Sequence, residues 1–179
     1  MELLNERSFN KITVQDITDR CGVNRNTFYY HYQDIYALFE ECCEMEADQV
    51  IRKYPKLNSI DECVDALTKE FYSKKKAIYH IFSSPNKDTY ISSVWRICEH
   101  LVTTYADTAF ADAPVSDSDR RLFIRFYKCA LFGLSIDWIN SGMKEEYAEE
   151  LKRICMLKKG NVETVIQNCI NSYKEENQI

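Results

Sequence analysis

The sequence predicts an all-α protein, with a short helix pair near the N-terminus and a larger helical domain behind it. Apolar residues recur at helical spacing along most of the chain, and no stretch alternates as a strand would. The chain contains only 4 glycines and 3 prolines, so its helices are rarely interrupted. One of these glycines separates two short helical patterns near the N-terminus, which is typical of a helix-turn-helix.

Thr13 and Asn24 each predict the start of a helix. Thr13 is followed by Asp16 at the third helical position, which is a capping-box pattern, and Asn24 is a favourable N-cap residue. Gly22 falls where the first of these helices must end, because glycine readily adopts the left-handed conformation of a helix exit. The stretch around these residues therefore predicts a helix-turn-helix.

The second of these helices carries polar and aromatic side chains around one apolar residue, Phe28. In a helix-turn-helix the second helix enters the major groove of DNA. Arginine suits guanine, asparagine suits adenine, and threonine, tyrosine and histidine suit phosphates or a thymine methyl group. The alternative is a solvated helix hairpin within a bundle, which rarely has so many such residues at exposed positions. The predicted contacts to double-stranded DNA are Thr13, Gln15, Asn24, Arg25, Asn26, Thr27, Tyr29, Tyr30 and His31.

The segment KITVQDITDRCGVNRNTFYYHYQDIYALFEE resembles the DNA-binding signature of the TetR/AcrR family of transcriptional regulators. The shared features are the Thr-Val-x-Asp-Ile run, the Gly-Val turn and the Thr-Phe-Tyr-x-His-Tyr core. A weaker resemblance links GLSIDWINSGMKEE to a segment of many C-terminal domains of the family. The resemblance implies an all-helical homodimer, with a DNA-binding domain over residues 1–40 and an effector-binding and dimerisation domain over residues 41–179.

Two features depart from the family pattern. Relatives usually carry a basic arm and more of the first helix, so residues 1–7 are expected to be only the tail of that helix. Ile35 stands where the family often has a lysine that contacts a phosphate. These departures leave open an alternative, a helical dimer of the same descent with impaired DNA binding that acts as a ligand-binding or interaction module.

Composition and charge predict a cytoplasmic globular protein. The chain is 45% hydrophobic and 28% charged, and no apolar run approaches the roughly 20 residues of a membrane helix. The opening residues are too polar for a signal peptide. The net charge of -5 arises beyond residue 33, because the basic and acidic residues before it balance. We therefore expect DNA affinity to depend on a few placed contacts and not on a broad basic surface.

The cysteines and histidines show no metal-ligand spacing, and no catalytic motif is present, so we expect no metal, no cofactor and no enzyme activity. Most of the eight cysteines fall on apolar helix faces, where cysteine behaves as a small hydrophobic residue. The adjacent Cys42 and Cys43 leave a cysteine-based redox sensor open as a further alternative.

Caps and breaks divide the larger domain into helices. Ser59 and Glu62 form a second capping-box pattern, and Ser116 is a further N-cap residue. Residues 73–76 are expected to form a polar junction between two of the helices. Apolar spacing predicts helices over residues 35–52, 60–72, 77–82, 88–105, 117–141, 151–155 and 162–173.

Two functional surfaces are expected in the larger domain. Tyrosine, tryptophan and cysteine combine apolar walls with polar tips, which suits a cavity for a small effector. The helix over 117–141 and the last helix carry more apolar surface than one subunit needs, which predicts a four-helix dimer interface. The candidate cavity residues are Leu67, Phe71, Tyr90, Val94, Trp95, Cys98, Phe126 and Tyr127, and the candidate interface residues are Phe123, Leu131, Leu134, Val162, Ile166, Ile170 and Tyr173. Without a basic cluster, the cavity predicts an apolar effector that is neutral or cationic.

Overall fold

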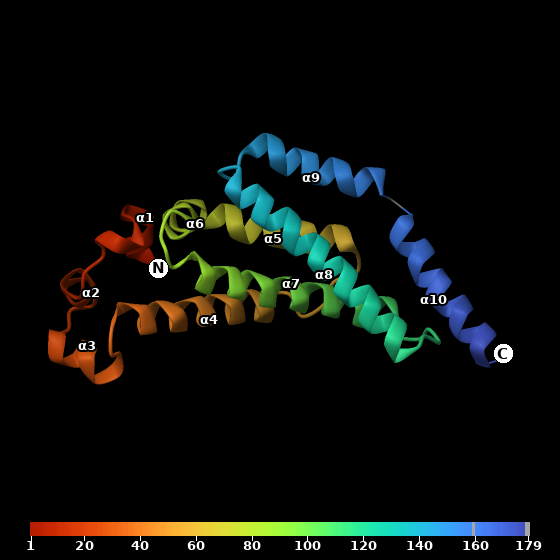
Figure 1. Cartoon of the computed structure of the whole chain (residues 1–179), viewed down its shortest axis with the longest axis horizontal. Coiled ribbons are helices and arrows are strands. Elements are labelled where there is room, and N and C mark those ends of the chain that lie inside the picture. Colours follow the sequence, from red (N-terminus) through yellow and green to blue (C-terminus); the bar gives the residue numbers. More distant parts are fainter. Residues whose placement is uncertain (159, 178–179) are drawn as a thin grey trace.

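The computed structural model describes residues 1–158 and 160–177, and this part of the chain is all-α as predicted (Figure 1). The N-terminal helices are α1 (Glu2–Glu6), the short 3-10 helix η1 (Phe9–Lys11), α2 (Val14–Cys21) and α3 (Arg25–His31). The remaining helices are α4 (Ile35–Lys53), α5 (Ile60–Ser73), α6 (Lys75–Phe82), α7 (Lys87–Ala109), α8 (Asp117–Asn140), α9 (Glu145–Leu157) and α10 (Asn161–Asn177). None of the described helices is long and apolar enough to cross a membrane.

The predicted caps of the helix-turn-helix are confirmed. The Thr13 hydroxyl accepts the backbone N–H of Asp16 at 3.1 Å, and the Asp16 carboxylate accepts the backbone N–H of Thr13 at 2.8 Å. The Asn24 side chain accepts the N–H of Thr27 at 2.9 Å, which starts α3. Gly22 ends α2 in the left-handed region, at a φ of 67° that other residues adopt only with strain. Local sequence alone therefore specifies where α2 begins and ends and where α3 begins.

Two predicted boundaries in the larger domain are only partly right. Ser59 caps α5 by accepting the N–H of Glu62 at 3.1 Å. The Glu62 carboxylate, however, accepts the N–H of Asn58 at 2.7 Å, so it does not complete the predicted capping box. The expected polar junction over residues 73–76 shrinks to Lys74, because α6 starts one residue later.

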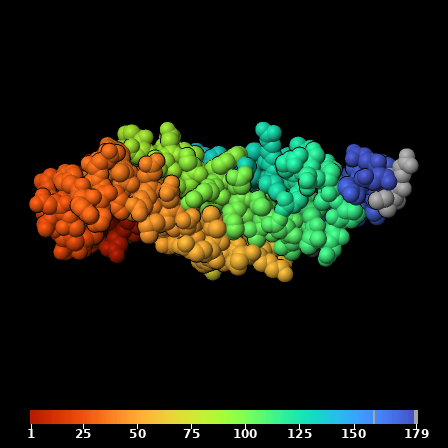
Figure 2. Space-filling view, turned by 90° about the horizontal axis from the view of Figure 1, so that it is seen from below, coloured from red at the N-terminus to blue at the C-terminus, as the bar shows by residue number. Residues whose placement is uncertain are grey.

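The helices form an elongated molecule, with α2 and α3 at one end and α10 at the other (Figures 1 and 2). Helix α7 is central to the larger domain, since it packs against α4, α5 and α8. The N-terminal helices meet this domain twice, through the continuous α4 and through the packing of α1 on α6. The His80 Nδ1 lies 2.6 Å from the Leu4 carbonyl oxygen, and because a carbonyl can only accept, Nδ1 carries the shared proton.

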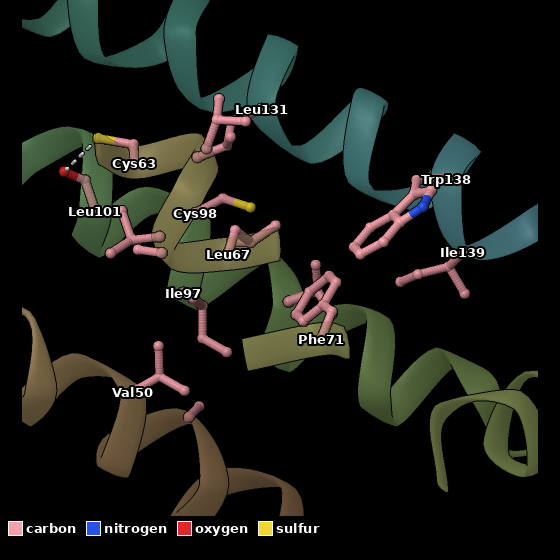
Figure 3. Close-up of a cluster of buried hydrophobic side chains, with 14 of the residues drawn as sticks. Val50, Cys63, Leu67, Phe71, Ile97, Cys98, Leu101, Leu131, Trp138 and Ile139 are labelled. Carbon is pink, nitrogen blue, oxygen red and sulfur yellow. Dashed lines mark hydrogen bonds between the residues drawn. The ribbon is translucent and has the colours of Figure 1, made fainter. Parts of the chain in front are cut away.

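The core of the larger domain lies between α5, α7 and α8 (Figure 3). Trp138 is 1% exposed and lies parallel to the ring of Phe71, with centroids 6.5 Å apart. Its indole N–H donates to the Lys144 carbonyl at 3.0 Å, which connects α8 to the start of α9. The thiol of Cys63 donates to the Leu101 carbonyl at 3.5 Å. Apolar packing therefore holds the larger domain together, and the polar groups of Trp138 and Cys63 are bonded to backbone carbonyls.

Candidate functional site

Helix α3 presents a polar face at one end of the molecule. Arg25, Asn26, Tyr29 and Tyr30 are exposed and share one side of the helix, because Arg25 and Tyr29, and Asn26 and Tyr30, are each four residues apart. Tyr30 is 85% exposed, although tyrosine usually buries part of its ring. On the opposite side Phe28 is only 5% exposed and fixes α3 to the helices below it. The structure thus places these four predicted side chains where an external partner can reach them, whereas Thr27 is half buried and its hydroxyl donates to Asn24 at 3.2 Å.

The predicted contacts on α2 are exposed but already engaged in local hydrogen bonds. The Gln15 side chain donates to Asp19 at 2.6 Å. The Thr13 hydroxyl donates to the Asp16 carboxylate at 2.6 Å, and this bond holds the pKa of Asp16 below its usual value. A phosphate contact by either residue would therefore have to share or replace an existing bond. His31, at the end of α3, is exposed.

Ion pairs leave Arg25 as a cation that an external anion can use. Arg7 donates to Asp16 at 3.1 Å, and Arg20 pairs with Glu6 of α1 at 2.6 Å. Arg25 is in no ion pair among the described residues, and its guanidinium lies 6.0 Å from the ring centroid of Tyr29. Sequence reasoning did not find the pairs of Arg7 and Arg20, because it could not place α1 beside α2.

The start of α4 cannot supply the phosphate contact that the family often has there. Ile35 is half buried and packs against the core. Asp34 precedes it and caps α4 by accepting the N–H of Ala37 at 2.9 Å. The nearby Tyr32 hydroxyl bonds to Glu41, which raises the pKa of Tyr32. Ile35, Asp34 and Tyr32 therefore provide no cation at this position.

Most of the side chains predicted to line an effector cavity are packed in the core of the subunit. Leu67, Phe71 and Cys98 are buried and pack among other core side chains (Figure 3). Val94 belongs to the same buried core. Leu67 borders a void of about 10 Å³, which is the size of one water molecule. Phe126, by contrast, points outward and is 62% exposed. Periodicity identified apolar helix faces correctly but could not tell a filled core from a hollow one.

Two further residues of the predicted lining pack against neighbouring side chains. Tyr90 is buried with its ring centroid 6.0 Å from that of Phe82. Trp95 is half buried beneath Phe132, and the ammonium group of Lys128 lies 4.2 Å from its ring centroid. Both side chains therefore already have the partners that a ligand would otherwise supply.

A cavity does occur in the larger domain, between α5, α7, α8, α9 and α10, and Tyr127 lines it as predicted. Its volume is about 170 Å³, and Tyr105, Asp61 and Glu163 also line it. Burial, followed by the charge of Glu163, raises the pKa of Tyr105 to about 12 and also raises the pKa of Tyr127. Both tyrosines are therefore neutral hydroxyls at physiological pH. The cavity combines apolar walls with two hydroxyls and two carboxylates, as a small-molecule site does.

Another cavity, of about 450 Å³, lies between α1, α2 and α4. Its walls are apolar residues such as Ile17 and Phe39. Its charged lining residues Arg20 and Glu2 already pair with each other at 3.2 Å. It therefore offers a ligand less unpaired polar chemistry than the cavity beneath α9 and α10.

The predicted dimer interface on α8 needs a correction by one helical face. Phe123 and Leu131 are 3% and 7% exposed, and Phe123 packs on the ring of Tyr127 with centroids 4.6 Å apart. Both belong to the core of the subunit, so a partner cannot reach them. The exposed apolar residues of α8 are Leu122 and Phe126. The other predicted interface residues are half buried: Leu134, Val162, Ile166, Ile170 and Tyr173.

The cysteines give the redox-sensor hypothesis little support. Burial raises the pKa of Cys43, Cys63 and Cys98 to about 12, and it also raises the pKa of Cys42. The reactive form of cysteine is the thiolate, so these raised values disfavour reaction at neutral pH. The Cys42 and Cys43 pair therefore lacks the environment of a reactive thiol.

Two family profiles match the chain and together span most of it. Residues 1–42 match the profile of bacterial regulatory proteins of the tetR family. Residues 58–160, more than half of the chain, match a profile described as a transcriptional regulator C-terminal region. A search of curated proteins found no match. Both profiles agree with the helix-turn-helix and the all-helical domain behind it, so this chain belongs to the TetR family and is a DNA-binding transcriptional regulator.

Proposed function

We propose that the protein is a homodimer that binds a pseudo-palindromic operator through two copies of α3. A two-fold dimer presents two recognition helices to two half-sites, so its preferred duplex shares that symmetry. The observation that carries the proposal is the exposed polar face of α3, where Arg25 has no carboxylate partner among the described residues. The activity proposed is binding and not catalysis.

A second subunit is the proposed partner of the outer face of α8. Leu122 and Phe126 lie one turn apart and are 58% and 62% exposed. Cys129 and Gly133 continue the same face, and nothing lies within 4 Å of the position a Cβ of Gly133 would take. Two large apolar side chains next to an open glycine offer a partner helix both apolar area and room for close approach. Val165 of α10 adds a further exposed apolar side chain.

A small effector bound in the larger domain is proposed to modulate operator affinity. Helix α4 runs without a break from Ile35 to Lys53, so the proposed boundary between residues 40 and 41 lies inside one helix. A movement of the larger domain is therefore carried directly to α3, as well as through the His80–Leu4 contact. By linkage, effector and operator must change each other's affinity by the same factor.

Arg25→Ala tests the role of α3. If Arg25 contacts a guanine, we expect the variant to lose about 1–3 kcal/mol of discrimination at one base pair. The preferred duplex is first selected from a random pool, and affinities for it and for single-base variants are then measured at fixed salt. Arg153→Ala, which removes an exposed arginine of α9, is the matched control and should leave the profile unchanged. An equal loss on every duplex would instead make Arg25 a phosphate contact.

A further inference from the structure

We propose that the cavity beneath α9 and α10 binds a small organic cation with an apolar body, such as an alkylammonium ion. The cavity is the one lined by Tyr105, Tyr127, Asp61 and Glu163. This inference rests on the proposed function, because it names the chemical class of the effector and the place where it binds. Its three supports are the aromatic walls, the charge of the lining and the part that α10 plays in forming the cavity.

The walls suit the body of such a ligand. Tyr105 is 5% exposed and Tyr127 is half buried, so both rings form the inner part of the cavity, whereas Asp61 and Glu163 are exposed at its mouth. A cation near a tyrosine ring is attracted by the negative face of the π system, and the attraction grows as water is excluded. Apolar side chains complete the walls: Ile60, Val64, Ala130, Leu131, Leu134, Ile154 and Val162. An ammonium group with short alkyl substituents satisfies both kinds of surface.

The charged lining groups favour one positive charge. Asp61 and Glu163 are carboxylates from different helices, and neither is in an ion pair among the described residues. Lys158 lines the same cavity, so the charged groups among its described lining residues sum to minus one, which a monocation balances. The Cys155 thiol is hydrogen-bonded to Asp61 and contributes no charge as a thiol. Both carboxylates also lie in first helical turns, where acids are favoured, but this preference does not require them to share a cavity.

A cation bound in the cavity would hold α10 against the rest of the subunit. It has no extensive contact with any other described helix, and it extends beyond the rest of the molecule in Figure 1. Glu163 and Val162 of α10 line the cavity, whereas Asp61 belongs to α5. A cation between the two carboxylates therefore ties α10 to the body of the subunit. Because Val165 lies on α10, the same ligand favours one arrangement of the proposed dimer interface.

The test compares two molecules of the same shape and different charge. Choline is titrated into the protein in a calorimeter, and 3,3-dimethyl-1-butanol, its neutral isostere, is titrated in parallel. We expect choline to bind about tenfold more tightly, because only the cation is attracted by the tyrosine rings and by the two carboxylates. Equal binding of the two molecules, or binding of neither, would overturn the proposal.

Variants then locate the site. Asp61→Asn and Glu163→Gln should each weaken choline binding about tenfold, whereas Glu149→Gln, an exposed carboxylate of α9 outside the cavity, should not. Lys158→Met should strengthen binding by removing the opposing charge, a gain that misfolding cannot mimic. Choline affinity unchanged in all three cavity variants would place the ligand elsewhere and contradict the assignment.

The operator experiment keeps this inference separate from the proposed function. Selection of a preferred duplex by the protein without choline tests the regulator alone. Choline binding that depends on Asp61 and Glu163 supports the cavity assignment whether or not operator affinity changes. An operator affinity that does not change on choline saturation would reject choline as the effector and leave its binding site standing.

Discussion

Replacing Leu122 and Phe126 together by glutamate is expected to convert the proposed dimer into monomers and to lower affinity for the proposed operator about a thousandfold. Both side chains lie on the outer face of α8, and charges facing each other across a two-fold axis repel without a partner. A monomer contacts one half-site, so it loses most of the advantage of specific over non-specific binding, which is about a thousandfold or more. Sedimentation gives the oligomeric state, and titration of the selected duplex gives the affinity.

The matched control for this double variant lies on α9. Met156 and Leu157 are 62% and 68% exposed, so their replacement by glutamate changes charge and apolar exposure to a similar extent. We expect the control to remain dimeric and to bind the operator normally. Because Leu122 and Phe126 are exposed in the subunit, their replacement should leave helix content unchanged. A folded Leu122→Glu, Phe126→Glu protein that stays dimeric would place the interface on another surface.

Trp138→Ala is expected to have the largest effect on stability, a loss of about 3–5 kcal/mol of unfolding free energy. The indole is 1% exposed and lies against Phe71, so its removal leaves a cavity that the surrounding helices cannot fill. The variant also leaves the Lys144 carbonyl without its donor. That bond closes the turn between α8 and α9, where Gly142 and Met143 both have positive φ.

Chemical denaturation of the wild type and the variant at one protein concentration measures this loss. Trp95→Ala is the control. Because Trp95 is half buried at the edge of the domain, its replacement should lower the free energy of unfolding distinctly less than Trp138→Ala does. Trp138→Phe should lower stability less than Trp138→Ala, since it keeps an aromatic ring beside Phe71 while removing the N–H donor and part of the indole volume. A loss below about 1 kcal/mol for Trp138→Ala would mean that the core around Phe71 relaxes to fill the space.

The sequence predicted correctly those features that depend on contacts between residues close together along the chain. The Thr13–Asp16 cap and the Gly22 turn each involve only residues within the same helix or next to it, so both were predictable. The exposed polar face of α3 was predictable for the same reason, because its side chains share one helix with Phe28 as the anchor. The family resemblance of this segment was correct, and the profile match covers the same residues.

The cavity and the interface were not predictable in the same way. Helix α8 is apolar over more than one face, so periodicity could not tell whether Phe123 or Phe126 turns inward. The same ambiguity placed a cavity around Phe71 and Cys98, which the structure fills with side chains. Asp61 and Glu163 were unremarkable in the sequence, because they are far apart along the chain.

By itself the sequence determined the helical class, the caps of α2 and α3, and the exposed polar face of α3. Each of these follows from hydrogen bonds and side-chain spacing within a few residues. Only the tertiary structure decided which face of α8 is buried, which side chains line a cavity, and which cations remain unpaired. Those features depend on the packing of distant helices, where the choice between a filled core and a hollow one comes from side-chain volume and not from sequence spacing.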